Sequence, residues 1–227
     1  MEKIFELLHK EGFERTTLSL SQPIVVHAVA GAGKSRLLRL VIDEGIQISL
    51  FTKGAEVPRT QSFAGCNLEL GGIRILDEYQ TESTEEARRY HLVLGDPLQE
   101  ENRGTFLQPH FTKAKSERFG TNTCALLNAI GINIFSDRFD TVIVRELFDR
   151  TEPEGVIIAL DDSAYDLLAL HGGNPKRVCE VVGATFPVVS VFTTKRLKEV
   201  PQHICYIALS RHRYKLTLYT SHAARET

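Results

Sequence analysis

The sequence lacks several features that mark particular classes of protein. Its 227 residues include no tryptophan and one methionine. No apolar run approaches the roughly 20 residues that a membrane-spanning helix needs. The four cysteines lie far apart and form no CxxC pair: Cys66, Cys124, Cys179 and Cys205. Because a zinc site usually brings cysteines together in such pairs, this spacing argues against zinc.

The first residues also lack the pattern of a secretory signal. Charges at Glu2, Lys3 and Glu6 interrupt the apolar side chains, whereas a signal needs an unbroken apolar segment after a basic start. We therefore expect reduced thiols in a cytosolic protein that is not itself a membrane protein.

The chain has no excess of positive charge. Lys and Arg number 27, Asp and Glu number 29, and the formal net charge is -2. This balance excludes a globally basic nucleic-acid-binding protein but is compatible with a local basic groove. Hydrophobic residues make up 42% and charged residues 25%, which is typical of a globular protein rather than a disordered one.

Runs of β-branched residues alternate with helical patterns along the chain, which predicts an α/β fold with mainly parallel sheets. The length fits one large domain or two small ones. Near residues 100–120 the composition shifts to Asn, Arg, Thr, Gln, Pro and Lys without a clear period. We therefore place a domain junction there and predict two domains, residues 1–115 and 116–227.

The same patterns predict the individual elements. In the first domain they are helices at 2–10, 35–45 and 83–90, and strands at 24–29, 47–52, 73–76 and 91–94. In the second they are helices near 121–130, 163–170 and 203–211, and strands near 141–144, 156–160, 177–182, 188–193 and 215–219.

The strongest motif is AVAGAGKS, residues 28–35, which lies between a predicted strand and a predicted helix. A glycine-rich turn in this context is typical of a P-loop, a phosphate-binding turn. Gly31 and Gly33 permit the backbone angles that direct successive N–H groups, Ala32 included, toward phosphate oxygens. The following helix aims its positive end at the same anion. Ala28 stands where the pattern usually has its first glycine.

Side chains in and after this motif carry the chemistry. Lys34 could reach the β- and γ-phosphates of a nucleotide such as ATP, and the Ser35 hydroxyl could bind Mg²⁺. Asp77 and Glu78 follow the strand at 73–76, where a P-loop predicts a metal-binding carboxylate. Asp77 would hold Mg²⁺ directly or through water, and Glu78 could accept a proton from the attacking water. An isolated Asp-Glu pair would usually be a solvated strand end.

A third segment, GDPLQ at residues 95–99, also follows a predicted strand. Gln99 is a neutral group that could sense a γ-phosphate and orient water. Taken alone, the segment would be interpreted as a simple Asp-Pro turn.

In order, GAGKS, LDEY, GDPLQ and the later YIALSRH, residues 206–212, resemble the motifs of superfamily 1 viral RNA helicases. The small size and the segments VVHAVAGAGKS and ILDEY resemble one branch, the first triple-gene-block movement proteins of potexvirus-like plant viruses. The resemblance runs from about residue 10 to residue 219. It implies a P-loop NTPase of two RecA-like lobes, with nucleotide between them and single-stranded RNA across their top.

The resemblance assigns two arginines to the nucleotide as well. Arg211 matches the arginine of the last motif, which reaches the γ-phosphate from the second lobe, and Arg118 lies where the family carries another arginine at the lobe junction. A planar guanidinium can bridge the oxygens over which charge spreads in phosphoryl transfer. Without the motif, Arg211 would be interpreted as a surface arginine beside His212 and Arg213.

RNA contacts are less readable. Residues 180–186, EVVGATF, resemble the family's fifth motif, which couples RNA to nucleotide, although Val182 stands where many viral helicases have Gln. Cations could bind phosphates and the rings of Phe111 and Phe119 could stack on bases, in a sequence-independent and salt-sensitive manner. The alternative is a solvated junction with buried phenylalanines. The candidate RNA contacts are Lys53, Lys113, Lys115 and Thr185, with Arg118 in the same basic run.

The leading hypothesis is a Mg²⁺-dependent, ATP-hydrolysing RNA helicase that binds single-stranded RNA. The resemblance implies cell-to-cell movement of a plant virus, in the host cytoplasm and at plasmodesmata. It also implies self-association and, as partners, viral coat protein and the small membrane movement proteins. The alternative is a non-enzymatic RNA-binding module for movement or suppression of RNA silencing, with vestigial turnover, which Val182 favours. A cellular kinase or small GTPase is disfavoured because neither an arginine-rich lid nor an NKxD motif is present.

Overall fold

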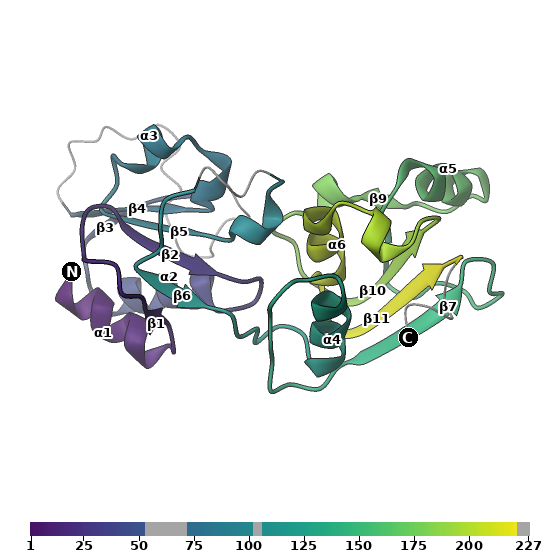
Figure 1. Ribbon diagram of the computed structural model, residues 1–227, viewed down its shortest axis with the longest axis horizontal. Helices are drawn as coiled ribbons and strands as arrows, with labels where there is room; N and C mark the ends of the chain where they lie inside the picture. Colours follow the sequence, from purple (N-terminus) through teal and green to yellow (C-terminus); the bar gives the residue numbers. More distant parts are fainter. Residues whose placement is uncertain (53–71, 102–105, 222–227) are drawn as a thin grey trace. The chain divides into compact units, whose positions relative to one another are not determined.

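The structure, a computed structural model, describes residues 1–52, 72–101 and 106–221. The chain divides into two compact units, Met1–Ala114 and Lys115–Thr227. Each unit contains one mainly parallel sheet with helices packed against it (Figure 1). This is the RecA-like α/β arrangement that the sequence predicts.

The sheet of the first unit has the strand order β1-β6-β2-β5-β4-β3. Only the short edge strand β1 is antiparallel to its neighbour among these strands. Because the carboxyl ends of parallel strands meet at one edge of a sheet, the turns after β2, β4 and β5 lie along the same edge. The strands are β1 (Glu14–Arg15), β2 (Ile24–Ala28), β3 (Ile48–Thr52), β4 (Ile73–Asp77), β5 (Leu92–Gly95) and β6 (Phe111–Lys113).

Helices cover both faces of this sheet. The α1 helix (Glu2–Lys10) and the α2 helix (Lys34–Asp43) lie on one face, and α3 (Thr84–Ala87) lies on the other (Figure 1). The α1 helix buries Ile4, Leu7 and Leu8, which share one helical face at i, i+3 and i+4. Two short 3-10 turns, η1 (Tyr79–Thr81) and η2 (Pro97–Gln99), follow β4 and β5.

The second unit contains five parallel strands in the order β7-β11-β10-β8-β9. The α4 helix packs beside α6, and α5 packs against β8 and β10. The elements are α4 (Thr121–Ala129), β7 (Thr141–Glu146), β8 (Val156–Ala159), α5 (Asp162–Leu170), β9 (Lys176–Arg177), η4 (Val178–Val181), β10 (Phe186–Thr193), η5 (Leu197–Glu199), α6 (Gln202–Leu209) and β11 (His212–Thr220).

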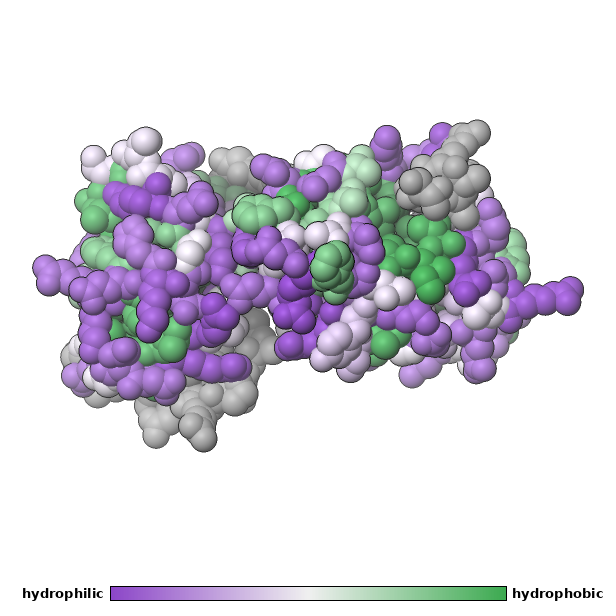
Figure 2. All heavy atoms as spheres, turned by 90° about the horizontal axis from the view of Figure 1, so that it is seen from below, coloured by the Kyte–Doolittle hydropathy of each residue, from purple (hydrophilic) through white to green (hydrophobic). Residues whose placement is uncertain are grey.

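Apolar side chains from the central strands and the helix faces fill the interior of each unit. Val26, Leu92 and Leu94 are fully buried in the first unit, and Val191 and Leu218 in the second. Burial of this kind is the main favourable contribution to folding. Hydrophilic residues accordingly cover much of the face shown in Figure 2.

Several elements differ from the sequence prediction, among them the two-residue strand β1, which was not predicted from the sequence. The strand predicted at 177–182 is wrong: β9 has two residues and the 3-10 turn η4 follows it. The Glu180 carboxylate accepts a hydrogen bond from the Arg177 N–H, which closes this turn. The helix predicted at 83–90 is shorter, because α3 ends at Ala87. The three-residue strand β6 lies in a segment that has no readable period.

No helix in the described parts of the chain combines the length and the apolar character needed to cross a membrane.

Candidate nucleotide-binding site

The AVAGAGKS motif forms the turn between β2 and α2. Its glycines, Gly31 at φ 78° and Gly33 at φ 98°, occupy the left-handed region that other residues rarely adopt. Gly33 is the N-cap of α2, so the first N–H groups of the helix lie in this turn. Such groups have no partner within the helix and make its beginning a site for anions.

Lys34 folds back onto this turn. Its side chain is buried, with 8% exposed, and its ammonium group donates a 2.9 Å hydrogen bond to the Ala28 carbonyl. This bond satisfies part of a buried charge. Ser35, in the first turn of α2, is exposed.

The acidic pair lies at the end of β4. Asp77 is the last residue of the strand, and its carboxylate is buried and accepts a 3.1 Å hydrogen bond from the Glu78 N–H. Burial and the neighbouring negative charge of Glu78 raise the pKa of Asp77 to about 7, while the positive charge of Lys34 opposes them. The opposing effect of Lys34 indicates that the P-loop lysine and the Asp77 carboxylate share one electrostatic environment.

Glu78 has the only positive φ among the described residues other than glycine, at φ 58° and ψ 41°. A non-glycine residue in this region carries backbone strain, and such strain concentrates at functional sites. Its side chain contacts that of Gln80, whose Nε2 lies 2.5 Å from Glu78 Oε2.

Gln99 lies in the turn that follows β5. It is buried, and its Nε2 donates a 3.1 Å hydrogen bond to Asp96 Oδ2. Asp96, which is also buried, accepts a 3.3 Å hydrogen bond from the Leu98 N–H through its other oxygen. The structure therefore brings the turns after β2, β4 and β5 together at one edge of the sheet and holds Gln99 through Asp96.

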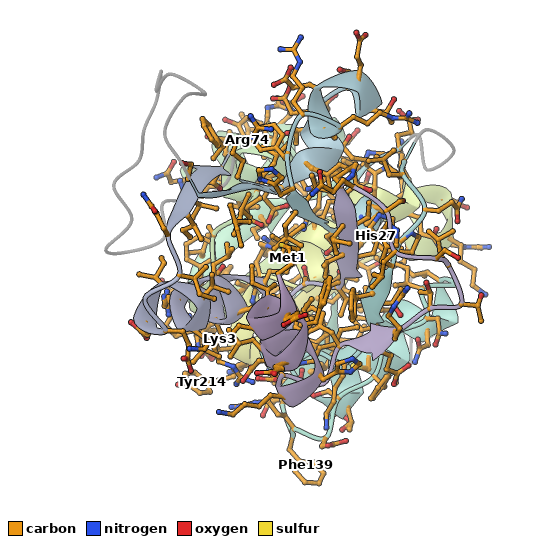
Figure 3. The ribbon with its side chains drawn as sticks, turned by 90° about the vertical axis from the view of Figure 1, so that its left-hand side faces the viewer. Met1, Lys3, His27, Arg74, Phe139 and Tyr214 are labelled. Atoms are coloured by element: carbon orange, nitrogen blue, oxygen red, sulfur yellow. The ribbon has the colours of Figure 1, made fainter. Side chains whose placement is uncertain are left out.

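A second pair of side chains lies beneath the P-loop. The rings of His27 and Tyr79 stack, and His27 Nε2 lies 2.5 Å from the Tyr79 hydroxyl (His27 is labelled in Figure 3). Burial, with a smaller contribution from the Lys34 charge, lowers the pKa of His27 to about 4, so the imidazole is neutral at pH 7. This contact links β2 to the η1 turn, which begins at Tyr79 directly after Glu78.

A hollow of about 220 Å³ opens beside the P-loop. It lies at the carboxyl edge of β2, β5 and β6, where ligands of parallel sheets usually bind. It is lined by His27, Ala28, Val29, Asp96, Pro97, Leu98, Thr112, Lys113 and Ala114.

The donor groups of this edge fit Mg²⁺. No cluster of three or more His, Cys, Asp or Glu residues that could hold a metal exists within the described residues. Mg²⁺ does not require one, because it usually binds one or two carboxylates together with phosphates and water. The raised pKa of Asp77 reflects a buried carboxylate with too little positive charge around it, and a cation would supply that charge.

The arginine of the last motif lies in the second unit, between α6 and β11. The Arg211 side chain is 1% exposed and donates hydrogen bonds to the Ile207 carbonyl at 2.8 Å and the Ala184 carbonyl at 3.3 Å. Arg118 donates to the Ser210 carbonyl at 3.2 Å, next to Arg211 in the chain.

Two of the four candidate RNA contacts bind other parts of the protein. Lys113 is buried and its ammonium group donates a 2.8 Å hydrogen bond to the Glu11 carbonyl. Lys115 forms a salt bridge with Asp137. Thr185 is partly exposed, in the loop before β10. Lys53 lies outside the described residues.

The idea that Phe111 and Phe119 stack on RNA bases is wrong for this structure. Phe111 is 1% exposed and Phe119 is fully buried, because both rings belong to the cores of their units. The alternative interpretation, a solvated junction with buried phenylalanines, is confirmed for the two phenylalanines, whereas Lys113 of the same run is buried rather than solvated. Exposed rings lie elsewhere in the second unit, among them Phe139, which is 91% exposed, and Tyr214, which is 61% exposed (both labelled in Figure 3).

Sequence reasoning missed three groups of this site. Gln80, Asp96 and His27 make side-chain hydrogen bonds in this site, yet none of them was assigned a role from the sequence. Asp96 lies within GDPLQ, His27 lies within VVHAVAGAGKS and Gln80 directly follows LDEY, so position in or beside a motif was the one signal available.

The parallel sheet, the P-loop turn and the acidic strand end together define a P-loop NTPase fold. Residues 24–220 match the viral superfamily 1 RNA helicase core domain. The chain therefore belongs to the viral superfamily 1 RNA helicase family.

Individual relatives narrow this assignment. The Movement and silencing protein TGBp1 of Apple stem pitting virus (isolate PA66) is 38% identical over 97% of this chain and 100% of its own length. The protein of the same name from Poplar mosaic virus (isolate ATCC Pv275) is 33% identical over 96% of each chain. Within the helicase family, the chain thus belongs to the TGBp1 movement and silencing proteins, which confirms the predicted resemblance.

Solved structures support the fold. An arterivirus nonstructural protein 10 (helicase) in complex with DNA has a TM-score of 0.54 and 17% identity over 96% of this chain. The PRRSV helicase has a TM-score of 0.59 and 17% identity over 89% of this chain. The chain spans 57% and 53% of these two helicases, so the likeness covers about half of each.

Proposed function

We propose that this protein is a Mg²⁺-dependent NTPase that hydrolyses ATP and binds single-stranded RNA. The observation that carries the proposal is the position of two groups at the carboxyl edge of one mainly parallel sheet: the P-loop with Lys34 follows β2, and the pair Asp77 and Glu78 lies at the end of β4. Family membership supports the same activity. ATP is the substrate in this proposal.

In the proposed reaction, different residues bind the phosphates and the metal ion. The N–H groups of Gly31, Ala32 and Gly33 and the Lys34 ammonium group bind the phosphates. Mg²⁺ held by Ser35 and Asp77 would supply positive charge to the phosphate oxygens.

The proposed chemical step is hydrolysis of the terminal phosphate. The oxygen of a water molecule bonds to the γ-phosphorus, the bond to the β–γ bridging oxygen breaks, and ADP leaves with that electron pair. Glu78 accepts the proton of the water, and Gln99 orients the water. Arg211 and Arg118 stabilise the charge on the γ-phosphate.

The biological role that we propose follows the relatives' names. The activity serves cell-to-cell movement of a plant virus, in the host cytoplasm and at plasmodesmata, with RNA, coat protein, the small membrane movement proteins and further copies of this chain as partners. Lys53, Lys115 and Thr185 are proposed RNA contacts. Lys113 is less accessible to RNA than Lys115 or Thr185, because it is buried and its ammonium group donates a hydrogen bond to the Glu11 carbonyl.

The proposal predicts RNA-stimulated ATP hydrolysis that depends on Lys34. We expect Lys34→Ala to lower the rate at least about 100-fold, because the lysine stabilises charge that develops on the phosphates. Phosphate release is measured with and without single-stranded RNA. Lys10→Ala, at an exposed lysine of the same unit, is the control and should keep the wild-type rate.

Suppression of RNA silencing is a second candidate function, favoured by the relatives' name "Movement and silencing protein". The Lys34→Ala variant separates the two functions in plant cells. Movement lost together with hydrolysis, while silencing suppression persists, would indicate that only movement needs turnover. Hydrolysis that persists in Lys34→Ala would contradict the catalytic assignment.

A further inference from the structure

Gln80 connects two parts of the candidate site. It lies in the η1 turn with 8% of its surface exposed. Its Nε2 donates a 2.5 Å hydrogen bond to Glu78 Oε2, and its Oε1 accepts a 3.2 Å hydrogen bond from the Asp96 N–H. These partners define the orientation of the amide, because only the NH₂ group can donate to a carboxylate and only the carbonyl can accept from an N–H.

The link continues into the turn after β5. The Asp96 N–H contacts Gln80, and Asp96 Oδ2 accepts a 3.1 Å hydrogen bond from Gln99 Nε2. Gln80 therefore joins Glu78, after β4, to the turn that carries Gln99. Both ends of this link are residues to which we assign roles at the attacking water.

The fold leaves space for Gln80 through a glycine. A Cβ atom at Gly95 would lie 2.6 Å from Gln80 Oε1 and 2.7 Å from the Tyr79 ring, closer than real Cβ atoms approach their neighbours. Glycine at the end of β5 thus allows the Gln80 amide to reach the Asp96 N–H.

Glu78 needs such support because its backbone is strained, at φ 58°. A glutamate would by itself prefer a negative φ, so contacts with the surrounding structure must stabilise the observed backbone conformation. A donor that binds Oε2 leaves Oε1 available to accept a proton.

We infer that Gln80 is a positioning residue for the hydrolysis proposed above, on which this inference rests. Its amide holds the Glu78 carboxylate in one orientation and keeps it aligned with the Gln99 turn. It acts through Glu78 and contacts no P-loop residue in the hydrogen bonds described, so its role is in the rate of the chemical step rather than in nucleotide affinity.

The test compares kcat with KM in Gln80 variants. Gln80→Met keeps the length of the side chain and removes both hydrogen bonds. We expect kcat to fall about 10- to 100-fold, since small displacements of a catalytic group cost rate steeply, while KM for ATP and Kd for ADP change less than about threefold. Gln108→Met, at an exposed glutamine of the same unit, is the matched control and should retain the wild-type kcat.

A double-mutant cycle identifies the route of the effect. In a Glu78→Gln background, Gln80→Met should lower kcat by less than about twofold more, because a residue that acts through another loses its effect when that residue is replaced. Losses that multiply in full would overturn the inference, as would a parallel rise in KM and Kd that accounts for the rate loss.

Folding and the proposed function are checked separately. Thermal melting establishes that each variant is folded, and Gln80→Glu, which retains an acceptor for the Asp96 N–H but repels Glu78, decides the matter if Gln80→Met does not fold. A wild-type rate in the folded variant, with Lys34→Ala inactive, overturns the role of Gln80 alone. A wild-type protein without ATP hydrolysis overturns the proposed function and this inference with it.

Discussion

Asp140 illustrates how one buried charge is satisfied in the second unit. Its side chain is fully buried and accepts hydrogen bonds from Thr123 Oγ1 at 2.6 Å, His212 Nε2 at 3.1 Å and the Asn122 N–H at 3.1 Å. Burial by itself would raise the pKa of Asp140, but the hydrogen bonds from His212, Thr123 and the Gly120 backbone together lower it to about 2.

This shift predicts a loss of stability in acid. Because the folded-state pKa lies below the ordinary value of 3.8, the ionised Asp140 stabilises the native state above about pH 4, and that contribution disappears as the pH falls through about 2. A shift of this size corresponds to about 2 kcal/mol. We expect Asp140→Asn to lower the free energy of unfolding by about that amount at pH 7 and by progressively less toward pH 2.

Urea denaturation of the second unit at pH 7 and pH 3 measures the effect. Asp149→Asn, which breaks the 3.2 Å surface pair with Arg145, is the control and should cost less at both pH values. Equal losses from Asp140→Asn at pH 7 and pH 3 would contradict the assignment.

The interpretation of Lys113 and Phe111 as RNA-binding residues shows where reasoning from residue types failed. Lys113 and Phe111 look like an RNA-binding pair in sequence, yet both are buried within the first unit. Lys113 places its ammonium group over the Phe13 ring at 5.3 Å and on the Glu11 carbonyl, which are about a hundred positions earlier in the chain. No pattern within the local sequence could indicate those partners.

At the scale of elements, the start of β8 depends on a close approach to β10. Gly155 precedes β8 at φ 71°, and a Cβ atom there would lie 2.2 Å from the Val188 carbonyl oxygen. Gly172, which follows α5 in the same unit, has a similar φ of 78° but nothing within 4 Å of its Cβ position. The two glycines thus separate the cost of backbone conformation from the cost of a steric clash.

We expect Gly172→Ala to destabilise the second unit by about 1 to 2 kcal/mol through backbone strain alone. Gly155→Ala should cost about 3 kcal/mol or more, because the methyl group also displaces the neighbouring strand. Chemical denaturation of both variants provides the comparison. Equal destabilisation of the two variants would show that β10 moves aside without a cost in free energy, which would contradict the steric argument.

Most helices and strands of four or more residues were predictable from sequence, and the two- and three-residue strands were not. The predicted helix at 121–130 and strand at 188–193 agree with α4 and β10 to within about two residues. The β6 strand was missed because three residues cannot display an alternation, and it exists because β2 and β1 supply its hydrogen-bonding partners. The η4 turn was mistaken for a strand because its valines are β-branched, whereas Glu180 closes the turn.

At the scale of the whole molecule, the proposed machinery is divided between two units. The P-loop and the acidic pair belong to Met1–Ala114, and Arg211 belongs to Lys115–Thr227. Arg211 donates hydrogen bonds to the Ile207 and Ala184 carbonyls and to Ser210 Oγ, which all belong to the second unit.

This division predicts different effects on binding and on turnover. We expect Arg211→Lys to lower kcat for ATP hydrolysis by about 10³-fold, as for other arginines that stabilise the transferred phosphoryl group, and to leave the affinity for ADP nearly unchanged. Arg213→Lys, at an exposed arginine two positions later, is the control. Unaltered turnover in a folded Arg211→Lys variant would place the arginine outside the reaction.

The sequence by itself determined the P-loop, the acidic strand end, the α/β class and the family, because each depends on residue types within a few positions of one another. Tertiary structure alone decided that Gln80 links Glu78 to Asp96 and that Lys34 donates a hydrogen bond to the Ala28 carbonyl. It also decided that the predicted run of basic and aromatic residues is mostly buried. These outcomes depend on which strands are neighbours in a sheet, and strand order arises from the packing of the whole unit rather than from any local pattern.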